Sequence, residues 1–149
     1  GQILRLRGPD GLLAGTVLAK VRGQDVYLVP IPDGGLIVGA TVEDLGFDPA
    51  VTAGTVYRLL RDAIEVVPEV GELALVETLA RWRPGTPDNG PLLGPTSLPG
   101  LVAATGHYRN GVLLAPVTAD AVAAWLTGDE PPAAALPFTP DRFAQEVLR

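Results

Sequence analysis

Apolar and polar side chains alternate through most of the first forty residues, which is the spacing of half-buried β-strands. The strand-like runs are GQILRLRG, AGTVLAKVRG, DVYLVPIP and LIVGATVE. Turns are expected at Arg22-Gly23-Gln24 and at Asp33-Gly34-Gly35, because an X-Gly-Gly sequence between two β-rich runs is typical of a hairpin. Pro30 cannot donate to a β-ladder, so the DVYLV strand should end there or lie at a sheet edge.

The period changes to that of a helix after Thr52, which is a suitable N-cap, and Pro68 marks the helix end. The apolar face of this helix should comprise Val56, Leu59, Leu60, Ala63, Ile64 and Val67, and the polar face Arg58, Arg61, Asp62 and Glu65. The following run, GELALVETLARWR, returns to the alternation of a strand.

The second half of the chain has fewer regular signals. Residues 84–100 are rich in proline and glycine and should be irregular. The run LVAAT predicts a short buried strand, and residues 111–126 predict a helix with Leu114, Val117, Ala121, Val122 and Trp125 on one face. DEPPAAALP should be a linker, and Thr139-Pro140-Asp141 should begin a last short helix. Strands first and helices later favour an α+β fold with a mixed or antiparallel sheet over a doubly wound one.

Composition narrows the functional classes. The net charge of the 149 residues is −6, so nucleic acid is not an expected partner. There is no cysteine, which fits a reducing compartment, and no apolar run approaches the ~20 residues that cross a bilayer. We therefore expect a cytoplasmic protein without a membrane partner. A single histidine and scattered carboxylates predict no metal site, and no serine lies in a nucleophile elbow.

Two arginines lie in unusual surroundings: Arg83 in R-P-G-T, and Arg109 in G-H-Y-R-N-G, where LVAAT gives way to a helix. Two guanidinium groups on loops suit a small carboxylate, since each can form a fork of hydrogen bonds. The glycine-flanked start of a helix suits a phosphate or an electron-rich ring, because its backbone N–H groups point outward. The competing interpretation of Arg83 is a surface arginine paired with Asp88 or Glu77. The residues alone therefore indicate an anion-binding site on an α+β domain.

Three blocks carry a more specific resemblance: VYLVPIPDGGLIVGATVED, RPGTPDNGPLLG and ATGHYRNGVLLAPVTADAVA. In this order they resemble the glycine oxidase (ThiO) branch of the FAD-dependent D-amino-acid oxidase (DAO) family. The similarity covers nearly the whole chain and is weakest in residues 1–22 and 128–149. It implies oxidation of glycine or another small amino acid by O2, yielding a 2-oxo acid, ammonia and hydrogen peroxide, within thiamine biosynthesis. It also implies FAD as cofactor and no protein side chain acting as acid or base.

Roles for individual residues follow from the same resemblance. Arg83 would bind the substrate carboxylate, Tyr27 would support it through its hydroxyl, and Arg109 would lie near both substrate and flavin. Val42 occupies a position where a methionine lines the substrate pocket in relatives, and Arg81-Trp82 puts bulk where glycine is common. Both departures leave the substrate preference open. The loop contacting flavin would comprise His107, Tyr108, Arg109, Asn110, Gly111, Val112 and Leu113.

The family's dinucleotide motif is not found in this sequence: no G-x-G-x-x-G lies between a strand and a helix, and the chain begins at Gly1 without methionine. We therefore expect a C-terminal piece of a longer enzyme. Residues 1–83 would be part of the substrate-binding domain. Residues 84–149 would contact the flavin, pack on an N-terminal FAD-binding half and complete that domain with a strand and a helix. A homo-oligomer is left open.

Two alternatives remain at this point. The first is another family member, such as a sarcosine oxidase-like or D-amino-acid dehydrogenase-like protein. The second is a stand-alone, non-enzymatic α+β binding module.

Overall fold

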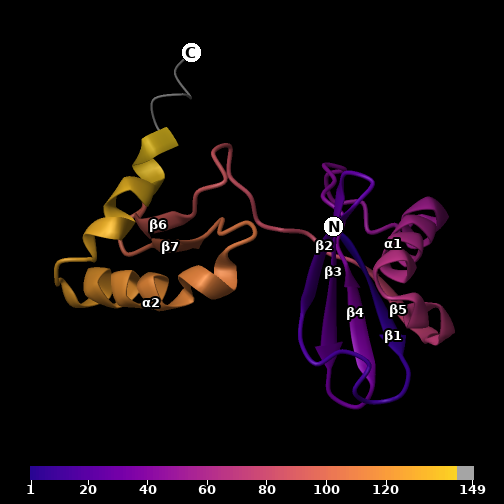
Figure 1. Ribbon diagram of the computed structural model, residues 1–149. Coiled ribbons are helices and arrows are strands. Elements are labelled where there is room, and N and C mark those ends of the chain that lie inside the picture. The colour runs from indigo at the N-terminus through magenta and orange to yellow at the C-terminus, as the bar shows by residue number, and fades with distance from the viewer. Residues whose placement is uncertain (144–149) are drawn as a thin grey trace. The chain divides into compact units, whose positions relative to one another are not determined.

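The computed structural model describes residues 1–143 and divides the chain into two compact units, Gly1–Trp82 and Arg83–Arg149 (Figure 1). Both units combine β-strands with helices, and every strand pair is antiparallel. The predicted α+β class is confirmed.

The first unit is built on a five-stranded sheet of order β2-β3-β4-β1-β5. Its strands are β1 (Gln2–Arg7), β2 (Val17–Val21), β3 (Gln24–Ile31), β4 (Gly35–Gly39) and β5 (Ala74–Ala80). Both predicted hairpin turns are present, with φ of 51° at Arg22, 79° at Gly23, 64° at Asp33 and 70° at Gly34. Paired positive φ values are those of the type I′ turn, whose twist matches that of the strands it joins.

Pro30 does not end its strand; of the two predicted alternatives, a strand end or a sheet edge, the edge is the one observed locally. It lies inside β3, between β2 and β4 in the sheet, and pairs with Leu36 of β4. The ladder to β2 extends only to the pair Val17–Leu28, so β3 has one neighbour where the proline occurs. The missing N–H therefore costs no ladder bond, because this end of β3 is locally an edge.

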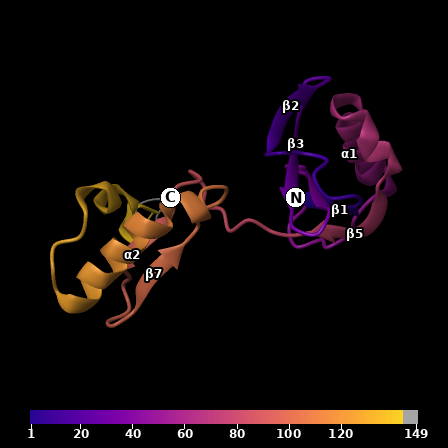
Figure 2. The same cartoon turned by 60° about the horizontal axis from the view of Figure 1, so that its bottom comes forward.

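Helix α1 (Ala53–Val66) covers one face of this sheet (Figure 2). The Thr52 hydroxyl accepts from the Thr55 N–H at 3.3 Å, as predicted for an N-cap. A short 3₁₀ helix, η1 (Pro68–Glu72), follows α1 and leads to β5. The core between helix and sheet comprises Leu4, Leu6, Val21, Val26, Leu28, Leu36, Val38, Leu59, Ala63 and Val70.

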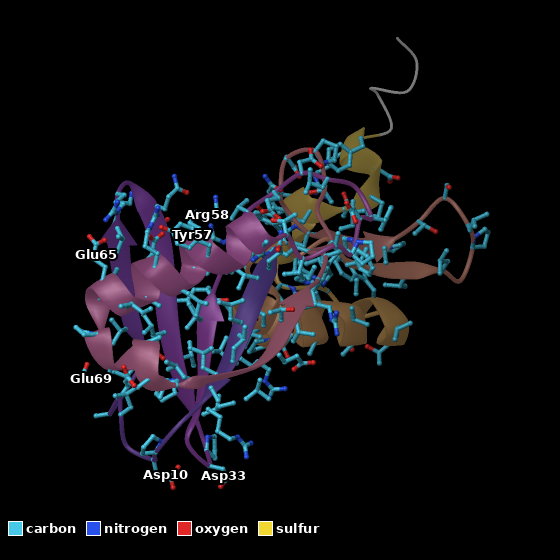
Figure 3. The ribbon with its side chains drawn as sticks, turned by 90° about the vertical axis from the view of Figure 1, so that its right-hand side faces the viewer. Asp10, Asp33, Tyr57, Arg58, Glu65 and Glu69 are labelled. Carbon is cyan, nitrogen blue, oxygen red and sulfur yellow. The ribbon has the colours of Figure 1, made fainter. Side chains whose placement is uncertain are left out.

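Asp62 is not on the exposed face of α1, where it was predicted. It is buried and pairs with Arg61, whose Nη2 lies 2.6 Å from its Oδ1. Residue 62 falls on the same stripe as Thr55 and Leu59, seven and three positions earlier, so its burial follows from helical geometry. Figure 3 shows Arg58 and Glu65 on α1, and Asp10 and Asp33 in turns at one end of the sheet. These turns are joined where the Gly8 N–H donates to the Gly34 carbonyl at 2.9 Å.

The second unit contains a two-stranded sheet and one long helix. Its elements are β6 (Leu92–Pro95), β7 (Val102–Thr105), α2 (Gly111–Thr127) and the 3₁₀ helices η2 (Ala133–Phe138) and η3 (Pro140–Phe143). Its core comprises Leu93, Ala121 and Ala135, with Trp125 and Phe138 packed against them. The predicted helices after Asn110 and Thr139 are present.

Three expectations for this unit were wrong. Residues 84–100 are not wholly irregular, because they include β6, which pairs with β7. Pro95 is the last residue of β6, so it does not interrupt the ladder between the two strands. The LVAAT strand is half-buried to exposed, since β6 is its sole strand neighbour in the described part of the chain. The expected linker DEPPAAALP contributes η2, whose Ala135 is fully packed.

Candidate functional site

The two loops that carry Arg83 and Arg109 lie against each other within the second unit. The Tyr108 N–H donates to the Pro84 carbonyl at 2.9 Å. Gly106 is buried with a φ of 76°, and a Cβ there would come within 2.8 Å of the Thr86 methyl carbon. The loop after Arg83 and the loop before α2 are thus in direct backbone contact, and glycine at 106 permits that approach.

Asp88 organises the loop of residues 84–90. Its Oδ1 accepts from the Thr86 hydroxyl and from the Gly90 N–H, both at 2.9 Å. Thr86 also donates to the Gly90 carbonyl at 2.6 Å. Arg142 in η3 binds both Asp88 oxygens, and this pairing above all holds the pKa of Asp88 well below its ordinary value.

The acidic groups named as surface partners of Arg83 are engaged by other arginines. Asp88 pairs with Arg142, and Glu77 pairs with Arg5 across β5 and β1 at 3.2 Å. Arg83 itself, the first residue of the second unit, is half-buried. The choice between the surface and the substrate-binding interpretation of Arg83 stays a prediction.

The flavin-contacting loop predicted from the sequence leads directly into α2. Arg109 and Asn110 are exposed, and the first bond of the helix runs from the Leu114 N–H to the Asn110 carbonyl at 2.9 Å. The Asn110 side chain makes no capping bond, and the first turn holds no acidic residue. The amides preceding that bond belong to Gly111, Val112 and Leu113, so this helix start can receive an electronegative group.

His107 packs back onto the helix it precedes. Its Nε2 lies 2.9 Å from the Thr118 hydroxyl oxygen. The sequence singled out His107 but not Thr118, because the only available signal was their spacing of eleven residues. The contact fixes the loop relative to α2.

Tyr27 lies on the sheet face opposite α1. Val26 and Leu28 point into the core, so the side chain between them faces the other way. Tyr27 pairs with Gly39 of β4, and a Cβ at Gly39 would lie 2.5 Å from both Cζ and the hydroxyl oxygen of Tyr27. The phenol ring therefore lies directly across β4 in a space that only glycine leaves open.

Val42 follows β4 and is 60% exposed. With neighbours from β3 and α1 it lines a cavity of about 270 Å³, whose lining includes Thr41, Glu43, Arg58 and Asp62 but not Tyr27. The segment is held by Gln2, whose N–H donates to the Thr41 hydroxyl at 2.8 Å and whose side-chain amide donates to Glu43 at 2.9 Å. Sequence reasoning missed Gln2, a polar residue at the first position of an apolar strand face.

The first unit thus holds Tyr27 and Val42, and the second holds Arg83, Arg109 and the loop before α2. The structure brings together the two arginine loops. Convergence of Tyr27 with the two arginines stays a prediction.

Two negative findings concern the residues that the structure describes. The single histidine and the carboxylates among them form no group that could hold a metal ion. No helix within residues 1–143 is both long and apolar enough to cross a membrane.

Comparison with known proteins identifies the family. The model of the family DAO, FAD dependent oxidoreductase, matches residues 1–125. The chain belongs to this family. The expected resemblance is confirmed, and with it a relationship to glycine oxidases.

Individual relatives support this membership of the DAO family. The chain is 43% identical over 123 residues to the bifunctional protein ThiO/ThiG of Nostoc sp. strain PCC 7120, covering 83% of this chain and 19% of that protein. It is 37% identical to glycine oxidase of Pseudomonas putida, covering 95% of this chain and 38% of the relative. The crystal structure of glycine oxidase from Geobacillus kaustophilus matches with a TM-score of 0.83 at 38% identity, over 93% of this chain and 37% of that one. The DAO-family chain therefore spans less than two-fifths of the length of these relatives.

Proposed function

We propose that this chain forms the substrate-binding and flavin-contacting part of an FAD-dependent oxidase of glycine or another small amino acid. The observation that carries the proposal is the backbone contact between the Arg83 loop and the Arg109 loop at the start of α2. Relatives named glycine oxidase and ThiO/ThiG support the substrate class and a place in thiamine biosynthesis.

The start of α2 fits a flavin. Its first amides carry no side-chain cap and the first turn contains no acidic residue, so nothing in that turn would repel a ring that becomes negative on reduction. Val112 and Leu113 are 94% and 78% exposed, which leaves apolar surface for a flat ring. Residues 107–113 are the proposed contacts.

The chain's own residues bind and orient the substrate. Arg83 would hold the carboxylate in a fork of hydrogen bonds, and the Tyr27 hydroxyl would donate to the same group. Arg109 would lie on the flavin side, and Val42 would border the substrate. Bound FAD would supply the hydride acceptor, and its reoxidation by O2 would give hydrogen peroxide. Orientation of Cα is the main demand, so no acid or base is assigned.

Helix α2 needs a further covering surface. Apart from Thr118, Asp120 and Thr127 its residues are apolar or glycine with no separate polar face, and Leu126 is 69% exposed in addition to Val112 and Leu113. A helix without a polar face is typical of a buried element. We propose that an FAD-binding half, corresponding to the rest of the relatives' length, covers it.

The test uses the full FAD-loaded protein that carries this chain. Arg83→Ala should raise KM for glycine tens to thousands of fold, because losing one partner of a buried charge pair costs on the order of 2–5 kcal/mol. An amine without a carboxylate should be affected much less. Arg81→Ala, two residues away with an exposed side chain, is the matched control.

Equal losses with both substrates would mean that Arg83 is structural. Peroxide formation separates an oxidase from a dehydrogenase-like relative, which would reduce a dye instead. A protein that binds no flavin would favour the stand-alone binding module.

A further inference from the structure

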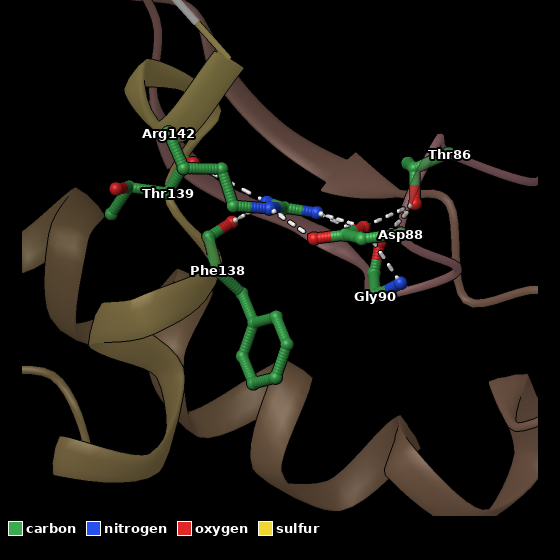
Figure 4. Close-up of polar contacts among 6 residues, drawn as sticks. All are labelled: Thr86, Asp88, Gly90, Phe138, Thr139 and Arg142. Atoms are coloured by element: carbon green, nitrogen blue, oxygen red, sulfur yellow. Dashed lines mark hydrogen bonds and ion pairs between the residues drawn. The ribbon is translucent and has the colours of Figure 1, made fainter.

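Arg142, in the last described helix, makes a dense set of polar contacts (Figure 4). Its Nε lies 2.9 Å from Asp88 Oδ2, and its Nη2 lies 3.1 Å from Asp88 Oδ1. The same Nη2 donates to the Gly90 carbonyl at 2.9 Å. Its Nη1 donates to the carbonyls of Phe138 at 2.8 Å and Thr139 at 3.3 Å. One guanidinium thus joins the 84–90 loop to the turn between η2 and η3.

The geometry of this group is that of a fixed fork. The Arg142 side chain is 15% exposed, and its guanidinium carbon lies 4.3 Å from the centre of the Phe143 ring. Lysine could carry the charge but could not reach two carboxylate oxygens and three carbonyls in one plane. The contact therefore specifies arginine rather than any cation.

The contacts continue from Arg142 to the two arginine loops. Asp88 binds the Thr86 hydroxyl, and the Thr86 methyl group lies over Gly106. At the other end of the same loop, the Pro84 carbonyl accepts from Tyr108, next to Arg109. The residue that begins the loop is Arg83, so its backbone position depends on the shape that Asp88 maintains.

We infer that Arg142 is a positioning residue for substrate binding: its fork on Asp88 and Gly90 holds the 84–90 loop in the shape that presents Arg83. The inference deepens the proposed function and rests on it for the kinetic result. It adds Arg142, which lies near the end of the described residues and outside the sequence motifs, to the residues that determine affinity for a carboxylate.

The experiment compares Arg142→Gln and Arg142→Lys with Asp141→Asn in the full FAD-loaded protein. Asp141 is the exposed neighbour in the same short helix and serves as the control. Both Arg142 variants should raise KM for glycine roughly ten-fold or more with little change in kcat, since a hydrogen bond to a charged group is lost from the loop and not from the reacting atoms. Hydrogen exchange should accelerate at the Asn89 and Gly90 amides, which bond within the loop.

Several results would overturn the inference. Wild-type KM in Arg142→Lys would show that the fork is not needed. Equally faster exchange throughout α2 would indicate general destabilisation instead of positioning, and an equal effect of Asp141→Asn would indicate a charge effect. If the Arg142→Gln variant loses its flavin or helical content, KM and loop exchange are compared between Arg142→Lys and the wild type alone. A wild-type protein that oxidises no amino acid would refute the proposed function, whereas loop exchange would still decide whether Arg142 holds the loop.

Discussion

Replacing Gly39 by alanine should displace the Tyr27 hydroxyl. The new Cβ would lie 2.5 Å from Cζ and Oη and 2.8 Å from Cε2 of Tyr27, whereas carbon contacts are normally about 3.5–4 Å. Strand β4 pairs on both sides, with Tyr27 of β3 and Ile3 of β1 opposite Gly39, so the backbone cannot easily yield. The phenol ring must therefore move by about 1 Å.

The size of the effect follows from that displacement. A shift of about 1 Å in a positioned group can cost on the order of 100-fold in rate. A lost hydrogen bond to a charged substrate group is worth about 1.5–3 kcal/mol, or roughly 10- to 150-fold. We expect kcat/KM for glycine to fall roughly 10- to 100-fold, with a stability loss of about 1–3 kcal/mol from overpacking.

The assay is a double-mutant cycle with Tyr27→Phe in the full FAD-loaded protein. Once the hydroxyl is gone, Gly39→Ala should add little further loss, because both changes act on the hydrogen bond proposed between Tyr27 and the substrate. Gly35→Ala is the matched control: it lies on the same strand, and its new Cβ meets Ile31 instead of Tyr27. Additive losses from Gly39→Ala and Tyr27→Phe would refute the reasoning. So would an equal loss in Gly35→Ala.

Three further predictions concern stability and cofactor binding. Thr52→Ala should weaken the start of α1 by about 0.5–2 kcal/mol, seen as faster exchange of the Thr55 amide that Thr52 caps; unchanged exchange would contradict the cap. Arg142 lowers the pKa of Asp88 from an ordinary value of 3.8, so the charged carboxylate stabilises the fold fully above that value and progressively less as pH falls below it. Asp88→Asn should therefore destabilise the protein near neutral pH, and the variant should lose less further stability than the wild type below about pH 4. Parallel acid unfolding curves for the two proteins would show that Asp88 does not contribute to the loss of stability in acid. Residues 1–149 expressed alone should be colourless and should not oxidise glycine, because the sequence contains no G-x-G-x-x-G between a strand and a helix; yellow, peroxide-producing protein would show otherwise.

The features predicted well from the sequence are those whose causes lie close together along the chain. The strands and turns of residues 2–39 follow from alternation and from residues that tolerate positive φ. The helix after Thr52 follows from its cap and apolar spacing. Strand β6 was missed because its pairing with β7 comes from farther along the chain, and its flanking prolines resemble a loop. Asp62 was misplaced because a charged side chain was assigned outward although its helical position lies on the buried stripe.

The candidate site shows the same division. The motifs identified Arg83 and Arg109, and the structure adds the contact between their loops. Gln2, Thr118 and Arg142 were missed because each acts through a partner that no local pattern indicates; Arg142 and Asp88 are 54 positions apart. Gly39 gave no conformational signal either, since its role is the space it leaves for Tyr27.

Asp88 shows how motif and structure complete each other. A carboxylate five residues from an arginine proposed to bind a carboxylate would repel the substrate if it stayed unpaired, because like charges at short range oppose binding. Arg142 neutralises that charge and, through the same fork, fixes the loop. Asp88, the acidic residue of the R-P-G-T-x-D motif, can then accept hydrogen bonds from Thr86 and Gly90 within the loop without weakening the proposed anion site. An unpaired Asp88 would oppose substrate, whereas an Asp88 paired with Arg142 supports the loop that begins at Arg83.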